Sequence, residues 1–279
     1  MYESFYGMTE KPFSIQPDPD FLYFGKKHSS AYAMLEYGVE NRAGFTVITG
    51  EIGSGKTTLI RHLLNNLSDM VTVGLITNTQ RNITEILELV MLAFGQPFSG
   101  ISGLALYEDF QNFLIEEYRK GRRVILIVDE AQNLSPEVLE SLRLLSNINA
   151  DKHQLLQMII TGQPELKAIL SKPELRQFAQ RVAVDFHIGP LSDGEVLLYI
   201  LHRIKVAGRH KMLFTVGACQ SVATLTKGIP RAINILCDTA LVYGMAAEAE
   251  EIDEAIIEEV IRDKREFGVF QNDVDAHQS

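Results

Sequence analysis

The sequence predicts an α/β fold in which a five-stranded parallel sheet, sandwiched by helices, is followed by an all-helical domain. Between Phe45 and Pro190, short apolar runs typical of buried strands alternate with amphipathic runs typical of helices, which is the pattern of a parallel sheet covered on both faces. After Pro190 only helical periodicity remains. We therefore expect a doubly wound sheet domain at 45–190 and a helical domain at 191–265.

Residues 1–44 combine aromatic residues with turn formers ahead of a helical run at about 29–41. We expect them to form an arm and a first helix that pack near the ligand site. Five apolar runs in the sheet domain predict strands, at 45–49, 71–77, 124–128, 156–161 and 182–188.

The region after Pro190 predicts helices interrupted at Gly208, at Gly217 and at the run Gly228-Ile229-Pro230. The helix at 192–206 begins with a capping box, because Ser192 is followed three residues later by Glu195. The last helix is expected at about 253–265. Residues 266–279 are expected to be a flexible acidic tail.

Composition describes a globular protein. The 279 residues include 26 basic and 36 acidic side chains, a net charge of −10, and 46% of them are hydrophobic, which excludes disordered and fibrous classes. The segment 248–279 holds 11 acids and 3 bases, so the rest of the chain is nearly neutral and the overall acidity does not exclude a nucleic-acid partner.

Cys219 and Cys237 lie in apolar helical runs, which favours buried thiols in a reducing cytoplasm. We find no secretory signal and expect no membrane-spanning segment.

A complete phosphate-binding loop follows the first predicted strand and precedes a helix, the context that the motif requires: Gly50-Glu51-Ile52-Gly53-Ser54-Gly55-Lys56-Thr57. Its glycines allow successive amides to turn inward around phosphate oxygens, reinforced by the positive end of the helix. Lys56 is expected to neutralise β- and γ-phosphate charge, and Thr57 to place its hydroxyl on Mg²⁺. We count Thr58 with this ATP-binding set.

The predicted strand at 124–128 ends in Asp129 and Glu130, the Walker B pattern at the carboxyl edge of a parallel sheet. We expect Asp129 to hold Mg²⁺ through a bound water and Glu130 to polarise the attacking water. Because the strand at 71–77 intervenes in the chain, we also expect one extra strand between the two motif strands.

Other polar residues are candidates to contact the γ-phosphate. The strand at 156–161 ends in Thr161, and Gln163 follows two residues later; either one suits a hydrogen bond to the attacking water or the γ-phosphate. Arg176 and Arg181 precede the last strand, and Arg231 opens a helix of the second domain. A guanidinium spreads positive charge in a planar fork that suits a phosphoryl group in transit.

Together these motifs resemble AAA+ ATPases. The runs Met1-Tyr2-Glu3-Ser4-Phe5-Tyr6-Gly7, Lys11-Pro12-Phe13-Ser14, Pro17-Asp18-Pro19, Asp129-Glu130-Ala131-Gln132 and Leu142-Arg143-Leu144-Leu145-Ser146-Asn147 look like those of the general secretion pathway protein A (ExeA-type) ATPases. The resemblance spans about residues 1–265.

The resemblance implies ATP bound between the sheet domain and a helical lid, and between subunits of a hexamer-like ring or filament. It implies that Arg181, or else Arg176, is an arginine finger, that Arg231 is the sensor 2 arginine and that Thr161 is sensor 1. It also implies that Tyr23 and the run Pro17-Asp18-Pro19 lie near the adenine.

The resemblance further implies an ATP-hydrolysing assembly motor or switch for a bacterial envelope system, such as type II secretion, an MSHA-type pilus, or exopolysaccharide and exosortase machinery. We expect a cytoplasmic protein that reaches the inner membrane through a partner protein. Longer members continue into a membrane helix and a peptidoglycan-binding region. This sequence is either a short member, like MSHA biogenesis ATPases, or truncated.

Two alternatives remain. One is a DNA-binding regulator like the transposition ATPases, supported by two basic clusters: Arg119, Lys120, Arg122 and Arg123, and Arg203, Lys205, Arg209 and Lys211. The lack of a recognisable nucleic-acid motif makes it less favoured. The other is a nucleotide-gated scaffold with little hydrolysis, against which Glu130 argues.

Overall fold

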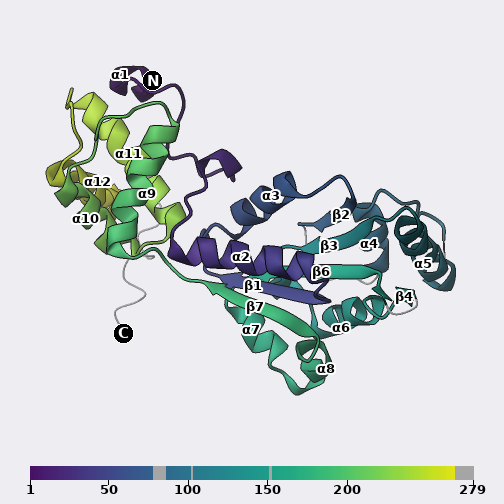
Figure 1. Ribbon diagram of the computed structural model, residues 1–279. Helices are drawn as coiled ribbons and strands as arrows, with labels where there is room; N and C mark the ends of the chain where they lie inside the picture. The colour runs from purple at the N-terminus through teal and green to yellow at the C-terminus, as the bar shows by residue number, and fades with distance from the viewer. Residues whose placement is uncertain (78–85, 102, 151–152, 268–279) are drawn as a thin grey trace. The chain divides into compact units, whose positions relative to one another are not determined.

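The computed structural model describes residues 1–77, 86–101, 103–150 and 153–267. Its internal contacts divide the chain into two units (Figure 1). The sheet unit comprises Lys26–Ile52 and Leu59–Gly189, and the helical unit comprises Met1–Gly25, Gly53–Thr58 and the chain from Pro190 onward.

The sheet unit contains the five predicted parallel strands. They are β1 (Phe45–Gly50), β2 (Val71–Ile76), β3 (Arg123–Val128), β6 (Leu156–Gly162) and β7 (Val182–Ile188). Their order across the sheet is β2-β3-β6-β1-β7, so an extra strand does separate β1 from β3, as predicted. That strand is β6, however, and β2, the strand on which the expectation was based, lies at the edge of the sheet.

Helices cover both faces of this sheet. Figure 1 shows α2 (Lys26–Glu40) and α3 (Lys56–Asn66) on one side, and α6 (Pro136–Leu145), α7 (Glu165–Leu170) and α8 (Arg176–Ala179) on the other. The remaining elements of the unit are α4 (Ile86–Ala93), α5 (Gly103–Arg119), the 3₁₀ turns η2 (Ala131–Asn133) and η3 (Pro173–Leu175), and the two-residue strands β4 (Asn149–Ala150) and β5 (His153–Gln154), which the sequence did not predict.

Strand β3 runs through the middle of the apolar core. All residues from Val124 to Val128 are buried, and Leu126 and Val128 pack in one cluster with apolar side chains of α4, α5 and α6. A strand buried on both faces is a continuous apolar run, which explains why the sequence predicts it well. The same burial fixes the point at which the chain leaves the sheet at Asp129.

The helical unit contains α9 (Asp193–Val206), α10 (Val216–Thr226), α11 (Pro230–Ala246) and α12 (Glu254–Phe267). Glu195 accepts the Ser192 backbone N–H at 3.0 Å, which completes the carboxylate half of the predicted capping box. Gly217 does not break a helix, because Thr215 caps α10 one residue before it begins and Gly217 is its second residue. Residues 268–279 of the expected tail lie outside the described residues.

The first 25 residues complete the core of the helical unit, with α1 (Tyr2–Tyr6) and η1 (Pro19–Phe21). Tyr2, Tyr6 and Phe13 are buried in the same cluster as both cysteines. Burial raises the pKa of the Cys219 thiol to about 11. The two thiols are therefore core residues, as the sequence predicts.

Arg203 of α9 holds the arm in place. Its guanidinium donates to the carbonyl oxygens of Pro12 and Ser14 and lies 4.7 Å from the centre of the Phe21 ring. The side chain is 6% exposed, so these contacts and a hydrogen bond to the Tyr199 hydroxyl surround a buried charge. Buried charges require such partners.

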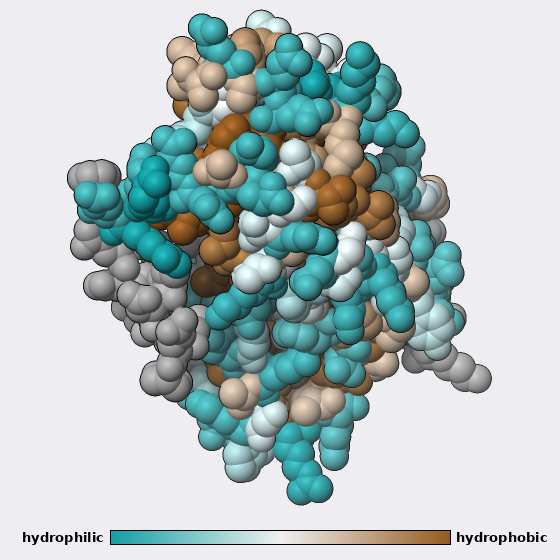
Figure 2. Space-filling model, turned by 90° about the vertical axis from the view of Figure 1, so that its left-hand side faces the viewer, coloured by the Kyte–Doolittle hydropathy of each residue, from teal (hydrophilic) through white to brown (hydrophobic). Residues whose placement is uncertain are grey.

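One face of the molecule carries both apolar and polar side chains. Figure 2 shows apolar side chains interspersed among polar ones on the side that faces left in Figure 1. Within the described parts of the chain, each helix is too short or too polar to cross a membrane.

Two glycines of the helical unit predict opposite effects on stability. An alanine methyl at Gly194, in the first turn of α9, would meet nothing within 4 Å, whereas at Gly228 the backbone has φ +72° and the methyl would lie 2.0 Å from the Leu191 carbonyl oxygen. We expect Gly194→Ala to raise the free energy of unfolding by roughly 0.4–1 kcal/mol, and Gly228→Ala to lower it by more than that. Urea unfolding measures both changes, and equal effects of the two variants would contradict the structure.

Candidate nucleotide site

The predicted phosphate loop connects β1 to α3. β1 ends at Gly50 and α3 begins at Lys56. Gly53 (φ +76°) and Gly55 (φ +97°) adopt left-handed backbone conformations, which side chains disfavour. Ser54 and Lys56 are buried, whereas Glu51 and Ile52 are exposed. Thr57 and Thr58 are half-buried. Because they are in the first turn of α3, their amides lie at the positive end of a helix.

Arg231 lies in the first turn of α11. Within the helical unit, its backbone N–H donates to the Gly53 carbonyl at 3.2 Å. A Cβ atom at Gly53 would lie 2.3 Å from the Arg231 Cβ, so only glycine fits. Close packing against Arg231 is therefore sufficient to require glycine at position 53, whether or not a phosphate binds there.

The two acids follow β3 at the carboxyl edge of the sheet. Val128 of β3 pairs with Ile160 of β6, so Asp129 and Thr161 are neighbours on adjacent parallel strands. The Thr161 hydroxyl, which is fully buried, donates to Asp129 Oδ1. The Glu130 backbone N–H donates to the same oxygen at 3.0 Å. Asp129 is thereby held in one orientation at the edge where the loop from β1 also begins.

Glu130 has an unusual backbone and two amide partners. Its φ of 54° and ψ of 37° are left-handed, a conformation that non-glycine residues adopt mainly where function or packing demands it. The side-chain amide of Gln132 donates to Glu130 Oε2 at 2.6 Å, and that of Gln163 donates to the same oxygen at 3.3 Å. Both amides therefore fix the plane of the carboxylate.

Gln132 also connects Glu130 to the end of β6. Its Oε1 accepts the Gln163 backbone N–H at 2.9 Å, and a Cβ at Gly162 would lie 2.9 Å from that same oxygen. The structure thus separates the two residues that the sequence left as alternatives, since Thr161 contacts Asp129 and Gln163 contacts Glu130. Gln132 was not among the candidate site residues of the sequence, although it lies only two residues after Glu130.

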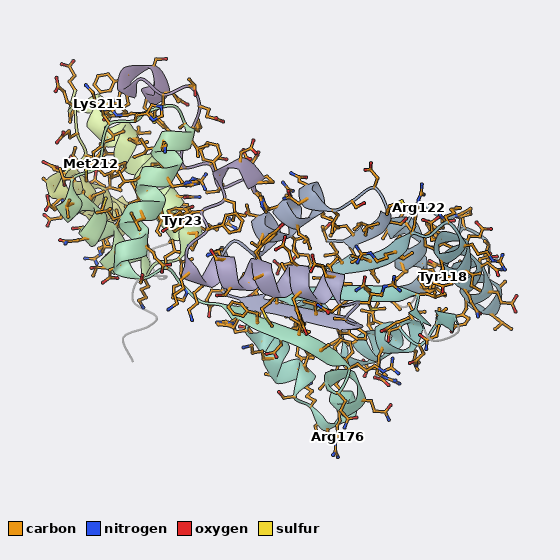
Figure 3. All side chains as sticks on the ribbon, viewed as in Figure 1. Tyr23, Tyr118, Arg122, Arg176, Lys211 and Met212 are labelled. Carbon is orange, nitrogen blue, oxygen red and sulfur yellow. The ribbon has the colours of Figure 1, made fainter. Side chains whose placement is uncertain are left out.

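The candidate arginine fingers differ in their surroundings. Arg181 directly precedes β7, and its Nη1 donates to Ser146 Oγ at 3.1 Å. Ser146 is buried and its hydroxyl donates to the Arg143 carbonyl at 2.6 Å. Arg176 begins α8 and points outward from the sheet unit (Figure 3). The sequence offered no signal for Ser146, because the contact joins residues 35 positions apart.

Tyr23 packs within the helical unit, where the centre of its ring lies 5.9 Å from that of Tyr199 and 5.7 Å from that of His202 (Figure 3).

The second basic cluster of the sequence, at residues 203–211, is not a solvated patch. Arg203 is buried against the arm, and Arg209 donates to the Tyr6 carbonyl. Only Lys205 and Lys211 of that cluster are exposed, which weakens its support for DNA binding.

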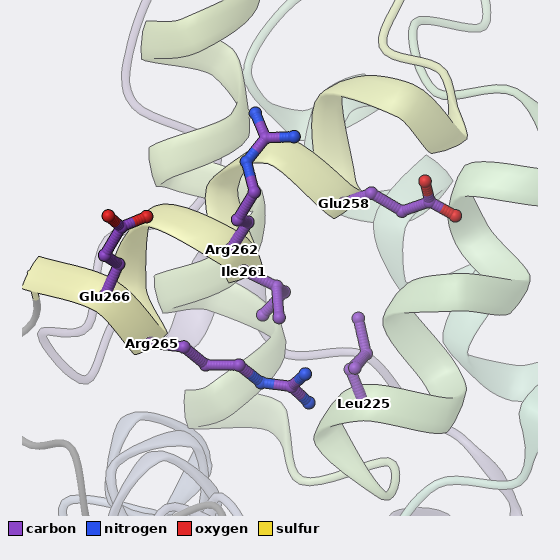
Figure 4. A pocket seen from close by; sticks show the side chains of 6 residues that line it. All are labelled: Leu225, Glu258, Ile261, Arg262, Arg265 and Glu266. Carbon is purple, nitrogen blue, oxygen red and sulfur yellow. The ribbon is translucent and has the colours of Figure 1, made fainter.

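The helical unit also has an open hollow of about 640 Å³ between α10 and α12 (Figure 4). Leu225 and Ile261 supply its apolar part, and two acids and two arginines surround them: Glu258, Glu266, Arg262 and Arg265. The formal charges of these four side chains sum to zero.

Comparison with known proteins supports the family resemblance. A family model described as "AAA domain" matches residues 39–170. The chain is 41% identical over 253 residues to general secretion pathway protein A of Aeromonas hydrophila, a match that covers 90% of this chain and 46% of that protein. The chain therefore spans about half the length of this curated relative.

Solved structures show the same fold at low sequence identity. The ORC1 protein of Aeropyrum pernix, solved in complex with DNA, has a TM-score of 0.65 at 19% identity, covering 91% of this chain and 70% of that one. Cdc6p of Pyrobaculum aerophilum has a TM-score of 0.64 at 18% identity, covering 84% and 68%.

The Thr161–Asp129 contact makes a measurable prediction. Thr161→Val keeps the shape of the side chain and removes a buried donor to a carboxylate, so we expect it to lower the free energy of unfolding by about 1.5–3 kcal/mol. Thr226→Val is the matched control, because its buried hydroxyl donates to a neutral carbonyl, of Val222. We expect it to cost about 1 kcal/mol or less. Equal losses in urea unfolding would show that the contact with Asp129 has no special weight.

Proposed function

The chain belongs to the AAA family of P-loop ATPases and is related to general secretion pathway protein A, and on that premise we propose that it binds ATP with Mg²⁺ and hydrolyses it. The observation that carries the proposal is the arrangement at one sheet edge: Asp129 is fixed by Thr161, and Glu130 is fixed by Gln132 and Gln163. The loop that follows β1 leaves the same edge.

The residues present fit a magnesium ion. A hydroxyl at Thr57 and a carboxylate at Asp129 are hard oxygen ligands, and Mg²⁺ in ATPases is held by one or two such groups together with waters and phosphates. The bound ion would offset charge on the β- and γ-phosphates. In the proposal, Asp129 acts through a water, and the residues from Gly50 to Thr58 bind the phosphates.

Glu130 is the proposed general base. Both amide hydrogen bonds reach its Oε2, so the carboxylate is oriented before substrate arrives. An oriented carboxylate accepts a proton from water as the water attacks the γ-phosphate. The amides of Gln132 and Gln163 would therefore be positioning groups for the base, and Thr161 would position Asp129.

We further propose that the site is completed by a second subunit of a ring or filament, with Arg181 as the finger and Arg231 as the arginine contributed by the lid. The contact with Ser146 supports Arg181 over Arg176, because a held guanidinium loses less freedom when it meets a phosphate. Arg176 points outward from the sheet unit and lacks such a hydrogen bond within the described parts of the chain.

The pathway proposal follows the named relative. We propose that the chain is an assembly motor or switch that acts at the cytoplasmic face of the inner membrane, through a partner protein of a secretion, pilus or polysaccharide system. Stimulation of ATP turnover by inner-membrane vesicles from cells that carry such a system, and not by vesicles from cells that lack it, is the expected result. Equal turnover with both vesicles would remove the pathway proposal and leave the ATPase intact.

Glu130→Gln tests the general base. We expect ATP turnover to fall about 10²–10⁴-fold, because the amide cannot accept the proton of water. ATP affinity is expected to change by about twofold or less. Glu165→Gln, on the exposed start of α7, is the control with the same chemical change. Single-turnover hydrolysis and equilibrium ATP binding separate the two effects, and full activity in Glu130→Gln would exclude this base.

Arg181→Ala tests the shared site. A finger supplied in trans is worth about 10³–10⁵ in turnover, so the variant is expected to be nearly inactive and to poison wild-type protein in mixtures. Arg176→Ala is expected to retain activity. Specific activity of the wild type is expected to rise with protein concentration. A linear mixing curve together with constant specific activity would mean that each subunit works alone.

A further inference from the structure

The sheet unit has a second concave site at the end opposite Asp129. It is a pocket of about 100 Å³ beside the start of β3 and of β6, lined in part by Arg42, Tyr118, Arg122, Arg123, Gln154 and Gln157. Figure 3 shows Tyr118 and Arg122 on the side of the sheet unit that carries α5. Asp129 and Thr161 lie at the other ends of the same two strands, so this pocket is separate from the nucleotide site.

The pocket lining is strongly positive. Three of its side chains are arginines, and none of its lining residues is acidic. Glu117 is in ionic contact with one of these arginines: its Oε2 lies 3.7 Å from Arg122 Nη1, and its Oε1 lies 2.9 Å from Lys120 Nζ. Glu117 is therefore shared by two cations, and the lining itself carries three positive charges and no negative one. This contrasts with the balanced hollow of the helical unit.

Part of the lining has a structural role. Arg123 Nη1 donates to the Val39 carbonyl at 3.0 Å, and Gln157 Nε2 lies 3.3 Å from the carbonyls of both Gly38 and Val39. These carbonyls are near the end of α2, where they also accept the backbone N–H groups of Ala43 and Arg42. These contacts explain why residues 123 and 157 have side chains that donate hydrogen bonds. They explain neither the excess of arginines nor the oxygen of the Gln157 amide.

The side-chain oxygen of Gln157 is a buried acceptor that lacks a donor within the described residues. Gln157 is 5% exposed, and its Oε1 has no hydrogen-bond partner among the residues that the structure describes. Buried acceptors are almost always paired, because water is lost without replacement. A ligand that suits this pocket therefore brings negative charge for the arginines and one hydrogen-bond donor for Gln157.

We propose that the pocket binds a protonated phosphate monoester group. Its oxygens accept from Arg42, Arg122 and Arg123, and its P–OH donates to Gln157 Oε1. Guanidinium forks match phosphate oxygens, and the second pKa of a monoester is near 6, so the protonated form is well populated in mildly acidic to neutral solution. The volume is several times the roughly 10–15 Å³ that one water needs, which leaves room for such a group. A phosphodiester and sulfate carry similar oxygens but no donor.

The test uses inorganic phosphate as the probe and Lys56→Ala protein, so that the phosphate loop does not contribute. Isothermal titration near pH 6, about the second pKa of the monoester, compares phosphate with sulfate at equal ionic strength. We expect sulfate to bind about tenfold more weakly, because it leaves Gln157 Oε1 unpaired. Arg42→Gln and Arg122→Gln are each expected to weaken phosphate binding about tenfold or more.

Arg119→Gln is the matched control. Arg119 ends α5, belongs to the same basic run and is exposed, but it does not line the pocket. Unchanged phosphate affinity in this variant supports the site. Equal affinity for phosphate and sulfate, or equal losses in Arg119→Gln and Arg122→Gln, would overturn the proposal in favour of a diffuse basic surface such as DNA would use. Circular dichroism of the exposed-arginine variants checks that they fold.

Phosphatidylcholine vesicles with and without phosphatidic acid identify the source of the group. Vesicle binding that requires phosphatidic acid, and that free phosphate displaces, identifies a lipid headgroup. Binding of free phosphate without vesicle binding identifies a soluble phosphorylated metabolite. Binding of neither probe would refute the proposal. Because the pocket lining does not include Glu130 or Arg181, this outcome is independent of the proposed ATPase activity.

Discussion

The hydrogen bond between Thr161 and Asp129 is the contact on which the candidate site depends. It forms because β3 and β6 are parallel neighbours, so that residues one step beyond their paired ends meet at the same edge. The bond also closes a chain of contacts from Asp129 through the backbone of Glu130 to Gln132 and Gln163. A sheet with any other strand beside β3 would bring different polar residues to these acids.

Burial explains how such an edge is held. β3 is inaccessible on both faces, so the strand cannot slide without exposing apolar side chains or shifting Asp129 into the core. Glu130, the second residue after the strand, has a left-handed backbone, and its carboxylate accepts a hydrogen bond from the Gln132 side chain.

Local patterns in the sequence predicted the features that depend on local physics. The phosphate loop, the buried strand with two acids after it, and the cap of α9 each reside in a short run whose residue types determine the geometry. The sequence did not reveal which strand lies between β1 and β3, because strand order depends on packing across the whole sheet. It also gave no sign of the contacts of Gln132 and Ser146, since an amide or a hydroxyl fits many surroundings. The arm was expected near the nucleotide, and no local pattern indicated that Arg203 donates to its carbonyls.

The attachment of the arm has a consequence for biosynthesis. Tyr2, Tyr6, Phe13 and Phe21 are synthesised before the helices against which they pack, and those helices begin near residue 193. Until those helices are made, the aromatic side chains have no core to join, while the sheet unit already contains all of its own strands. Contacts over such a separation form late and leave apolar surface exposed in the meantime. The start of this chain is therefore where we expect a nascent polypeptide to depend most on chaperones.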